Sequence, residues 1–317
     1  MKKKTLINTV LSIGLICLIG FSFLYLNNIN LINQVTDFMG PQQKKMSTPG
    51  FKFAMYGDAK SGVLLQYPVT AVIREKGIYV VDQDAGNIKV FGLGGRLAGV
   101  FGRLRSPYGI ALYGGNFYVS DMGTGQIVIF SKTGKQLGTL KIKGQKGMVP
   151  GGLLVDGKYL YIADVYQSRI LVCDLPQRRI IRTMGSFGTG RGQLKYPHGM
   201  AVDKAGNLYV ADSGNNRIVV FNKNGRYLKT IGGKDDRVGG ITTVRGVAID
   251  AKGIIYATAP LTGTIYAYNG DGEALYSLGG PGKENGQLGL PNDILIDAAG
   301  RLYVVETKNK RISVFEK

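Results

Sequence analysis

The sequence has no tryptophan, a single histidine (His198) and only two cysteines, Cys17 and Cys173. One histidine cannot build a two-histidine or three-histidine zinc site, so zinc enzymes of that kind are poor models. The cysteines form no disulfide framework, because Cys17 lies in an apolar run and leaves Cys173 alone. Helical periodicity is absent after residue 50, whereas 48 glycines and 18 tyrosines indicate tight turns between aromatic-bearing strands. The main domain is therefore expected to be all-β and held together by its core.

The N-terminal segment differs from the rest of the chain. Three lysines, at positions 2 to 4, precede an uncharged apolar stretch over residues 5–26, which is long enough to span a bilayer as a helix. A cleaved signal peptide would have a shorter apolar region and an A-x-A-like site, and the residues before Cys17 are not the small ones of a lipoprotein signal. We therefore predict an uncleaved transmembrane signal-anchor.

The charges around this helix predict its orientation. Lysines precede it and none follows before Lys44, so residues 1–4 are expected to stay in the cytoplasm. Residues 27–50 are rich in polar residues and are predicted to form a tether. Residues 51–317 are then expected outside the cytoplasm at the cell membrane.

A repeat organises residues 51–317. The aromatic-centred segments IYVVD, FYVSD, LYIAD, LYVAD, IYATA and LYVVE recur at a period of roughly 40 to 50 residues. Each is preceded by one apolar run and followed by a second, and in all but the last copy by a third. Four short antiparallel strands per repeat are typical of propeller blades. The shared tyrosines, at one per copy, are Tyr79, Tyr118, Tyr161, Tyr209, Tyr256 and Tyr303.

Six copies predict a six-bladed β-propeller of four-stranded antiparallel blades. The last copy lacks its fourth strand, and an orphan strand, FKFAMYG (51–57), precedes the first copy. Pairing the two would complete the sixth blade and leave no open sheet edge in the ring. We therefore predict that residues 51–57 close the last blade.

The fourth copy carries the most specific pattern. Its proline-x-glycine, apolar strand and "NLYVADSGNNRIVVF" resemble the NHL-repeat propellers, and the resemblance covers essentially residues 51–317. The loops 185–197 and 279–291 share G-x-x-G-x-x-x-G-Q-L-x-x-P, whereas Thr70 and Val244 depart from the pattern. With its apolar N-terminal segment, the whole chain resembles a membrane-anchored, bacterial-type member of this family.

His198 follows the proline of its repeat, at the start of the innermost strand. A histidine after this proline is common in such repeats, so we interpret it as structural or ligand-contacting rather than catalytic. The same position in the other blades should join it around one mouth of the central channel. Those positions are Val69, Tyr108, Gly151, Arg245 and Asn292.

Acidic residues end most of the tyrosine strands and raise the question of a metal ring. They are Asp82, Asp121, Asp164, Asp212 and Glu306. Calcium needs six to eight converging oxygens, and no compact loop motif supplies them. A structural role explains these acidic residues more simply. Their carboxylates would cap the loops and, in three copies, pair with Arg169, Arg217 or Arg311. No metal or other cofactor is predicted, and the glycine-rich loops lack the lysine and helix of a phosphate cradle.

The charge of the domain is strongly positive. Removing five lysines and Asp37 of the first 50 residues from the 40 basic and 21 acidic residues of the chain leaves 35 and 20. Much of the excess falls in the loops between blades, which emerge on the face of the His198 ring and should attract anions. The predicted contacts on this face are Tyr108, His198, Arg245 and Asn292, with Arg103, Arg105, Arg191, Lys195 and Arg237 further out.

These features predict a membrane-tethered binding or scaffold module for a protein or an anionic envelope polymer. One alternative is a propeller enzyme of the lyase or lactonase type with a metal in the funnel, to which Asn292, Asp293 and Glu306 would contribute oxygens. Another is RNA binding, which would require the opposite membrane orientation and is disfavoured by the charges around the helix.

Overall fold

The computed structural model describes residues 48–144, 147–232 and 241–317 of the chain. The predicted segments 1–4 and 5–26, and nearly all of the tether, lie outside the described residues. Within the described ranges, no helix has both the length and the apolar character needed to cross a bilayer.

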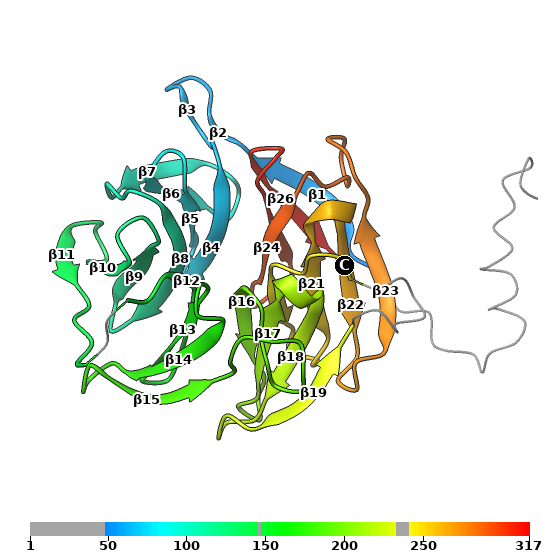
Figure 1. The fold of residues 1–317 in the computed structure, drawn as a ribbon. Coiled ribbons are helices and arrows are strands. Elements are labelled where there is room, and N and C mark those ends of the chain that lie inside the picture. The colour runs from blue at the N-terminus through cyan, green and yellow to red at the C-terminus, as the bar shows by residue number, and fades with distance from the viewer. Residues whose placement is uncertain (1–47, 145–146, 233–240) are drawn as a thin grey trace, which may run out of the picture. The chain divides into compact units, whose positions relative to one another are not determined.

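Six four-stranded antiparallel sheets confirm the predicted all-β, six-bladed propeller. The sheets are arranged around a central axis, each with its first strand innermost (Figure 1). The first blade is β4 (Pro68–Arg74), β5 (Gly77–Asp82), β6 (Asn87–Gly92) and β7 (Leu97–Phe101). The second is β8 (Pro107–Tyr113), β9 (Asn116–Asp121), β10 (Gln126–Phe130) and β11 (Gln136–Thr139), and the third is β12 (Pro150–Asp156), β13 (Tyr159–Asp164), β14 (Arg169–Asp174) and β15 (Arg179–Met184). The fourth is β16 (Pro197–Val202), β17 (Leu208–Asp212), β18 (Arg217–Phe221) and β19 (Tyr227–Ile231), and the fifth is β20 (Val247–Ile249), β21 (Ile255–Ala259), β22 (Thr264–Tyr268) and β23 (Ala274–Gly279).

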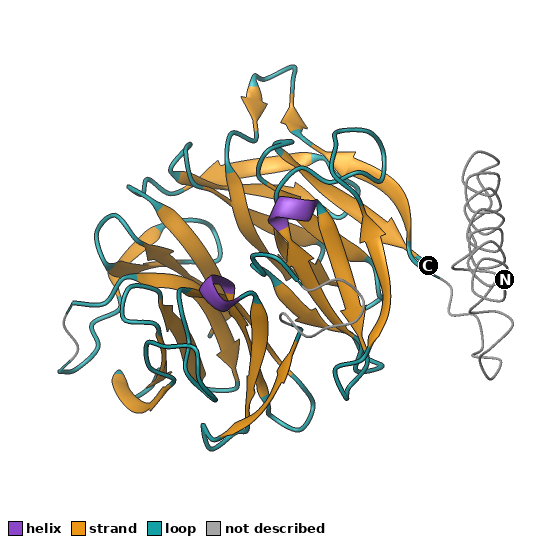
Figure 2. Cartoon of the chain, turned by 45° about the vertical axis from the view of Figure 1, so that its right-hand side comes forward, coloured by secondary structure: helices purple, strands orange, loops and turns teal. Residues whose placement is uncertain are grey.

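The sixth blade takes strands from both ends of the propeller. It consists of β24 (Pro291–Ile296), β25 (Leu302–Glu306), β26 (Arg311–Glu316) and, at its outer edge, β1 (Gly50–Met55). In Figure 1 the blue β1 lies beside the red β26, with Phe51 opposite Phe315. The strand ends earlier than the predicted 51–57, because the chain turns away into a small hairpin, β2 (Gly57–Asp58) and β3 (Val63–Leu64). This hairpin projects from the propeller (Figure 2).

The core lies between neighbouring blades. Side chains from the facing sides of two sheets interdigitate, as where Val81 and Ile88 of the first blade pack with Ile110 and Phe117 of the second. Cys173 is buried in such a layer, and burial raises the pKa of its thiol to about 11. It is a core residue and not an activated nucleophile.

The proline-x-glycine pattern has a steric cause. A Cβ on the glycine of one innermost strand would collide with the backbone of the next, as Gly199 would with the Arg245 carbonyl oxygen. Gly109, Gly152 and Gly246 face the same restriction. The absence of side chains therefore lets four of the innermost strands approach closely around the axis.

The first and last blades meet differently. Here Thr70 and Asp293 stand at the glycine position, and the Thr70 hydroxyl donates to the Asp293 carboxylate at 2.5 Å. Two further bonds cross the same junction, from the Asn292 amide to the Val69 carbonyl and from the Thr307 hydroxyl to the Pro68 carbonyl. The departure of Thr70 from the repeat pattern therefore serves ring closure.

Candidate functional site

The loops that join blades, and those between the second and third strands of each blade, lie on one face, which we call the top face. They include the short 3-10 helices η1 (Ser213–Asn215) and η2 (Pro260–Thr262) (Figure 2). At the centre of this face is a cavity of about 500 Å³, the upper cavity. Its lining residues are Tyr67, Val69, Gln83, Tyr108, Met122, Val165, Tyr196, His198, Ser213, Gly214, Thr243, Arg245 and Asn292.

The four predicted mouth residues come together here from different blades. Arg245 Nη1 lies 2.9 Å from His198 Nε2 and 3.5 Å from the Tyr108 hydroxyl. The Tyr108 and His198 rings pack with centroids 5.2 Å apart. Asn292 also lines this cavity, and its side-chain amide donates to the Val69 carbonyl. Of the six residues at the position after the proline, all but Gly151 line the upper cavity, and their role as ligand contacts stays a prediction.

The hydrogen bond to Arg245 defines the state of His198. A guanidinium can only donate, so Nε2 accepts and the proton of the neutral ring sits on Nδ1. Burial, together with the positive charge of Arg245, lowers the pKa of His198 to about 3. Within the described part of the chain, Nδ1 is buried and has no hydrogen-bond partner. A neutral imidazole engaged in this way is a fixed wall of the cavity and is not poised as a general base.

A second cavity, of about 380 Å³, which we call the lower cavity, lies between the innermost strands below the mouth residues. Val69 and Tyr108 line both cavities, so the mouth residues form a floor between them. Burial raises the pKa of Tyr108, and the phenol therefore stays protonated. Asp293 lines the lower cavity, and burial raises the pKa of its carboxyl to about 6.

The predicted outer cations do not reach the cavity. Arg103, Arg105 and Arg191 are exposed on the top-face loops, and Lys195 is partly exposed beside them. None of the four lines the upper cavity. Arg237 lies outside the described residues. The site therefore divides into an inner cavity with Arg245 and an outer basic rim.

The acidic residues at the ends of the tyrosine strands fix the top-face loops. Asp164 pairs with Arg169 at 3.0 Å, and the same pairing joins Asp212 to Arg217 and Glu306 to Arg311. The carboxylates also accept backbone N–H groups from the loop before their blade. Among the described residues, no group of three or more His, Cys, Asp or Glu side chains is placed to hold a metal ion.

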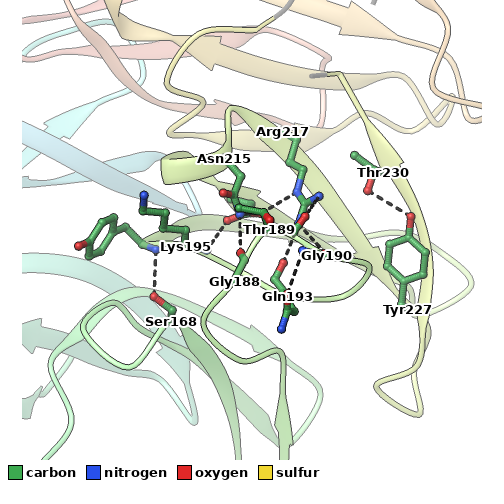
Figure 3. Close-up of polar contacts among 12 residues, drawn as sticks. Ser168, Gly188, Thr189, Gly190, Gln193, Lys195, Asn215, Arg217, Tyr227 and Thr230 are labelled. Carbon is green, nitrogen blue, oxygen red and sulfur yellow. Dashed lines mark hydrogen bonds and ion pairs between the residues drawn. The ribbon is translucent and has the colours of Figure 1, made fainter. Parts of the chain in front are cut away.

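The shared glycine-rich loop motif is a hydrogen-bonded framework. In the fourth blade, Arg217 donates to the carbonyls of Thr189, Gly190 and Gln193, and Asn215 donates to that of Gly188 (Figure 3). In the sixth blade, Arg311 and Asn309 make equivalent bonds to the matching loop. The motif therefore shapes the top face, in agreement with its interpretation as a blade connection.

Exposed apolar side chains gather on the top face, a feature that the sequence analysis missed. Tyr166, Leu261 and Phe187 are 79%, 69% and 64% exposed. The large exposed apolar residues of the top-face loops are Tyr56, Leu64, Tyr67, Tyr166, Phe187, Tyr196, Leu261 and Leu290. All the others in the described part of the chain lie on the outermost strands of the first five blades, at Val100, Leu137, Ile181, Leu228 and Leu275. The turns of the opposite face carry none, so the apolar rim of the top face is a distinct surface.

The NHL repeat family model matches residues 194–221, which contain the first three strands of the fourth blade. The chain therefore contains an NHL repeat within a six-bladed β-propeller. Human NHL repeat-containing protein 3 is 30% identical to this chain over 138 residues, or 38% of this chain and 40% of the human protein. The chain spans 40% or less of the relatives it matches.

Solved structures share the fold of this propeller at low sequence identity. A gluconolactonase from Xanthomonas campestris matches with a TM-score of 0.64 and 14% identity, covering 87% of this chain and 98% of that one. A streptogramin B lyase matches with a TM-score of 0.60 and 13% identity, covering 84% and 98%. These similarities establish the architecture, and function must be argued from the site.

Proposed function

We propose that this NHL propeller is a membrane-tethered, extracytoplasmic binding module that holds a protein partner on its top face. The observation that carries the proposal is the apolar rim, because exposed tyrosine, phenylalanine and leucine side chains cluster there and not on the opposite face. Aromatic side chains are enriched at protein interfaces. The rim surrounds a concave centre that would accept a projecting side chain.

The charge of the same loops favours an acidic partner. Basic residues outnumber acidic ones in the top-face loops that the structure describes. The basic ones are Lys60, Arg103, Arg105, Lys141, Lys143, Arg191, Lys195, Arg245, Lys283, Lys308 and Lys310, and the acidic ones are Asp58, Asp84 and Glu284. Such a surface accelerates association with an oppositely charged partner, and that acceleration falls as the salt concentration rises.

The enzyme alternative has weaker support. The three side chains considered for a funnel metal are held by separate contacts. Asp293 accepts from Thr70, the Asn292 amide donates to Val69, and Glu306 is shared among Arg311, Ser313 and Asn309. The fold relatives include enzymes, but the binding function is the one that the apolar rim favours.

The membrane tether is part of the proposal and rests on the sequence of residues 1–50. We expect protease added to intact, wall-stripped cells to digest the propeller, because the lysines before the apolar segment favour a cytoplasmic N-terminus. The measurement is immunoblotting of propeller fragments. Protection until the membrane is broken would contradict this orientation and make RNA the next ligand to test.

The apolar rim can be tested by substitution. The double variant Tyr166→Ser with Phe187→Ser should weaken partner binding by at least about tenfold, since buried aromatic anchors carry most interface energy. The matched control is Leu137→Ser with Leu228→Ser, which removes two exposed apolar side chains from the outermost strands. The measurement is co-purification of the full-length protein with its cross-linked partner from detergent-solubilised membranes.

Other outcomes identify other ligands. Equal loss in both double variants would contradict a top-face site. Binding that is unchanged in both double variants but is lost at high salt concentration would indicate an anionic polymer held by the basic loops.

A further inference from the structure

Among the described residues, the lining of the upper cavity carries a single formal charge. That charge is on Arg245, because no acidic side chain of the described residues lines the cavity and His198 is neutral. Among the described residues Arg245 forms no ion pair. Its guanidinium is only partly exposed at the cavity wall. A partly buried cation without a counter-ion favours a site for one negative charge.

The guanidinium also has a free edge. Its side-chain hydrogen bonds among the described residues, with His198 and Tyr108, both use Nη1. Nε and Nη2 have no acceptor among the described residues. These two groups form the fork that binds both oxygens of a carboxylate. His198 and Tyr108 hold the guanidinium in place, so that little conformational freedom would be lost on binding.

The second observation is His198 itself. Its Nδ1–H is a buried donor with no acceptor in the described part of the chain, at a residue that lines the same cavity and is 7% exposed. Buried donors are nearly always paired in folded proteins, so an unpaired one beside an unpaired cation indicates a missing acceptor. The Arg245 guanidinium and the His198 Nδ1–H would both be satisfied by oxygen acceptors that carry negative charge.

We propose that the upper cavity is a carboxylate pocket, in which the Arg245 guanidinium pairs with an aspartate or glutamate side chain of the protein partner. This inference rests on the proposed function. A monoanion matches the single charge of the lining better than a phosphate, which carries more charge at neutral pH. Tyr67, Tyr196 and Met122 would enclose the aliphatic part of the same residue.

His198 is the only histidine of the chain, so its imidazole gives a single reporter signal beside Arg245. We would titrate the full-length protein, labelled with ¹⁵N-histidine, with N-acetylglutamate N-methylamide and with the glutamine analogue at equal ionic strength. The glutamate compound should shift the imidazole resonances saturably, and the glutamine compound should not. Arg245→Gln should weaken binding by at least about tenfold and Arg245→Lys should weaken it less, because lysine keeps the charge but lacks the fork. Arg226→Gln, an exposed cation in a turn of the opposite face, should leave the titration unchanged.

Two results would overturn the pocket. One is an imidazole signal that glutamate does not move, and the other is the same shift in Arg245→Gln as in the unmodified protein. A tighter, Arg245-dependent response to inorganic phosphate would replace the carboxylate by a phosphate group. If partner binding is lost in the Tyr166/Phe187 variant but unchanged in Arg245→Gln, the top-face function stands and the carboxylate pocket fails.

Discussion

Replacing Arg311 by alanine should lower the free energy of unfolding by about 3–5 kcal/mol. Arg311 is 2% exposed and is paired with the fully buried Glu306 at 2.7 Å. It also donates to the Tyr56 hydroxyl and to three carbonyls of the loop before the sixth blade. Its loss would leave a buried carboxylate unpaired and would free the segment after the closing strand.

The repeat supplies matched controls for this prediction. Arg217 and Arg169 hold the equivalent position, but their side chains are 15% and 26% exposed. The destabilisation should therefore decrease from Arg311→Ala to Arg217→Ala to Arg169→Ala, as measured by urea unfolding. Adding Glu306→Ala to Arg311→Ala should recover part of the loss, because no unpaired charge then remains. A smaller effect for Arg311→Ala than for Arg169→Ala would show that burial does not control these pairs.

The second large effect is a pair of opposed pH dependences. Asp293 has a raised pKa of about 6 in the folded protein, so its contribution to stability is full below pH 3.8 and is lost as pH rises to 6. His198 has a lowered pKa of about 3, so its contribution is present above pH 6.5 and is lost as pH falls. Each changes the free energy of unfolding by about 1.4 kcal/mol per pH unit between pH 4 and 6, in opposite directions.

Single variants should separate the two. Between pH 6 and pH 4, Asp293→Asn should lose about 3 kcal/mol relative to the unmodified protein. His198→Gln, whose amide oxygen can still accept from Arg245, should gain a similar amount. The measurement is urea unfolding at pH 4, 5, 6 and 7. Curves parallel to those of the unmodified protein would mean that neither group titrates as its burial implies.

The repeat in the sequence predicted the backbone well. Tyr79 and its five counterparts gave the blade count, and the incomplete last copy gave the ring closure by β1. The position of His198 predicted which residues meet at the mouth, because the same repeat position must face the same part of the channel in every blade. These features depend on strand period and topology alone.

The sequence repeat could not predict contacts between residues that lie far apart in the sequence. Thr70 was an unexplained exception to the repeat pattern until the structure placed it beside Asp293, across the first and last blades and 223 residues away. The exposure of Phe187 depends on how Arg217 and Asn215 hold the loop in which it lies. The repeat position separated Arg245 from the outer cations, but the sequence could not show that Arg245 is only partly exposed and lies against His198 and Tyr108.

The central claim is that the top face holds a protein partner. Its most direct test is site-specific photo-crosslinking in living cells, with the crosslinking residue at Phe187 on the top face, at Leu137 on an outermost strand or at Lys204 in a turn of the opposite face. The account predicts a discrete protein adduct at Phe187 and none at the other two positions. An adduct at Lys204 or Leu137 with none at Phe187 would contradict it.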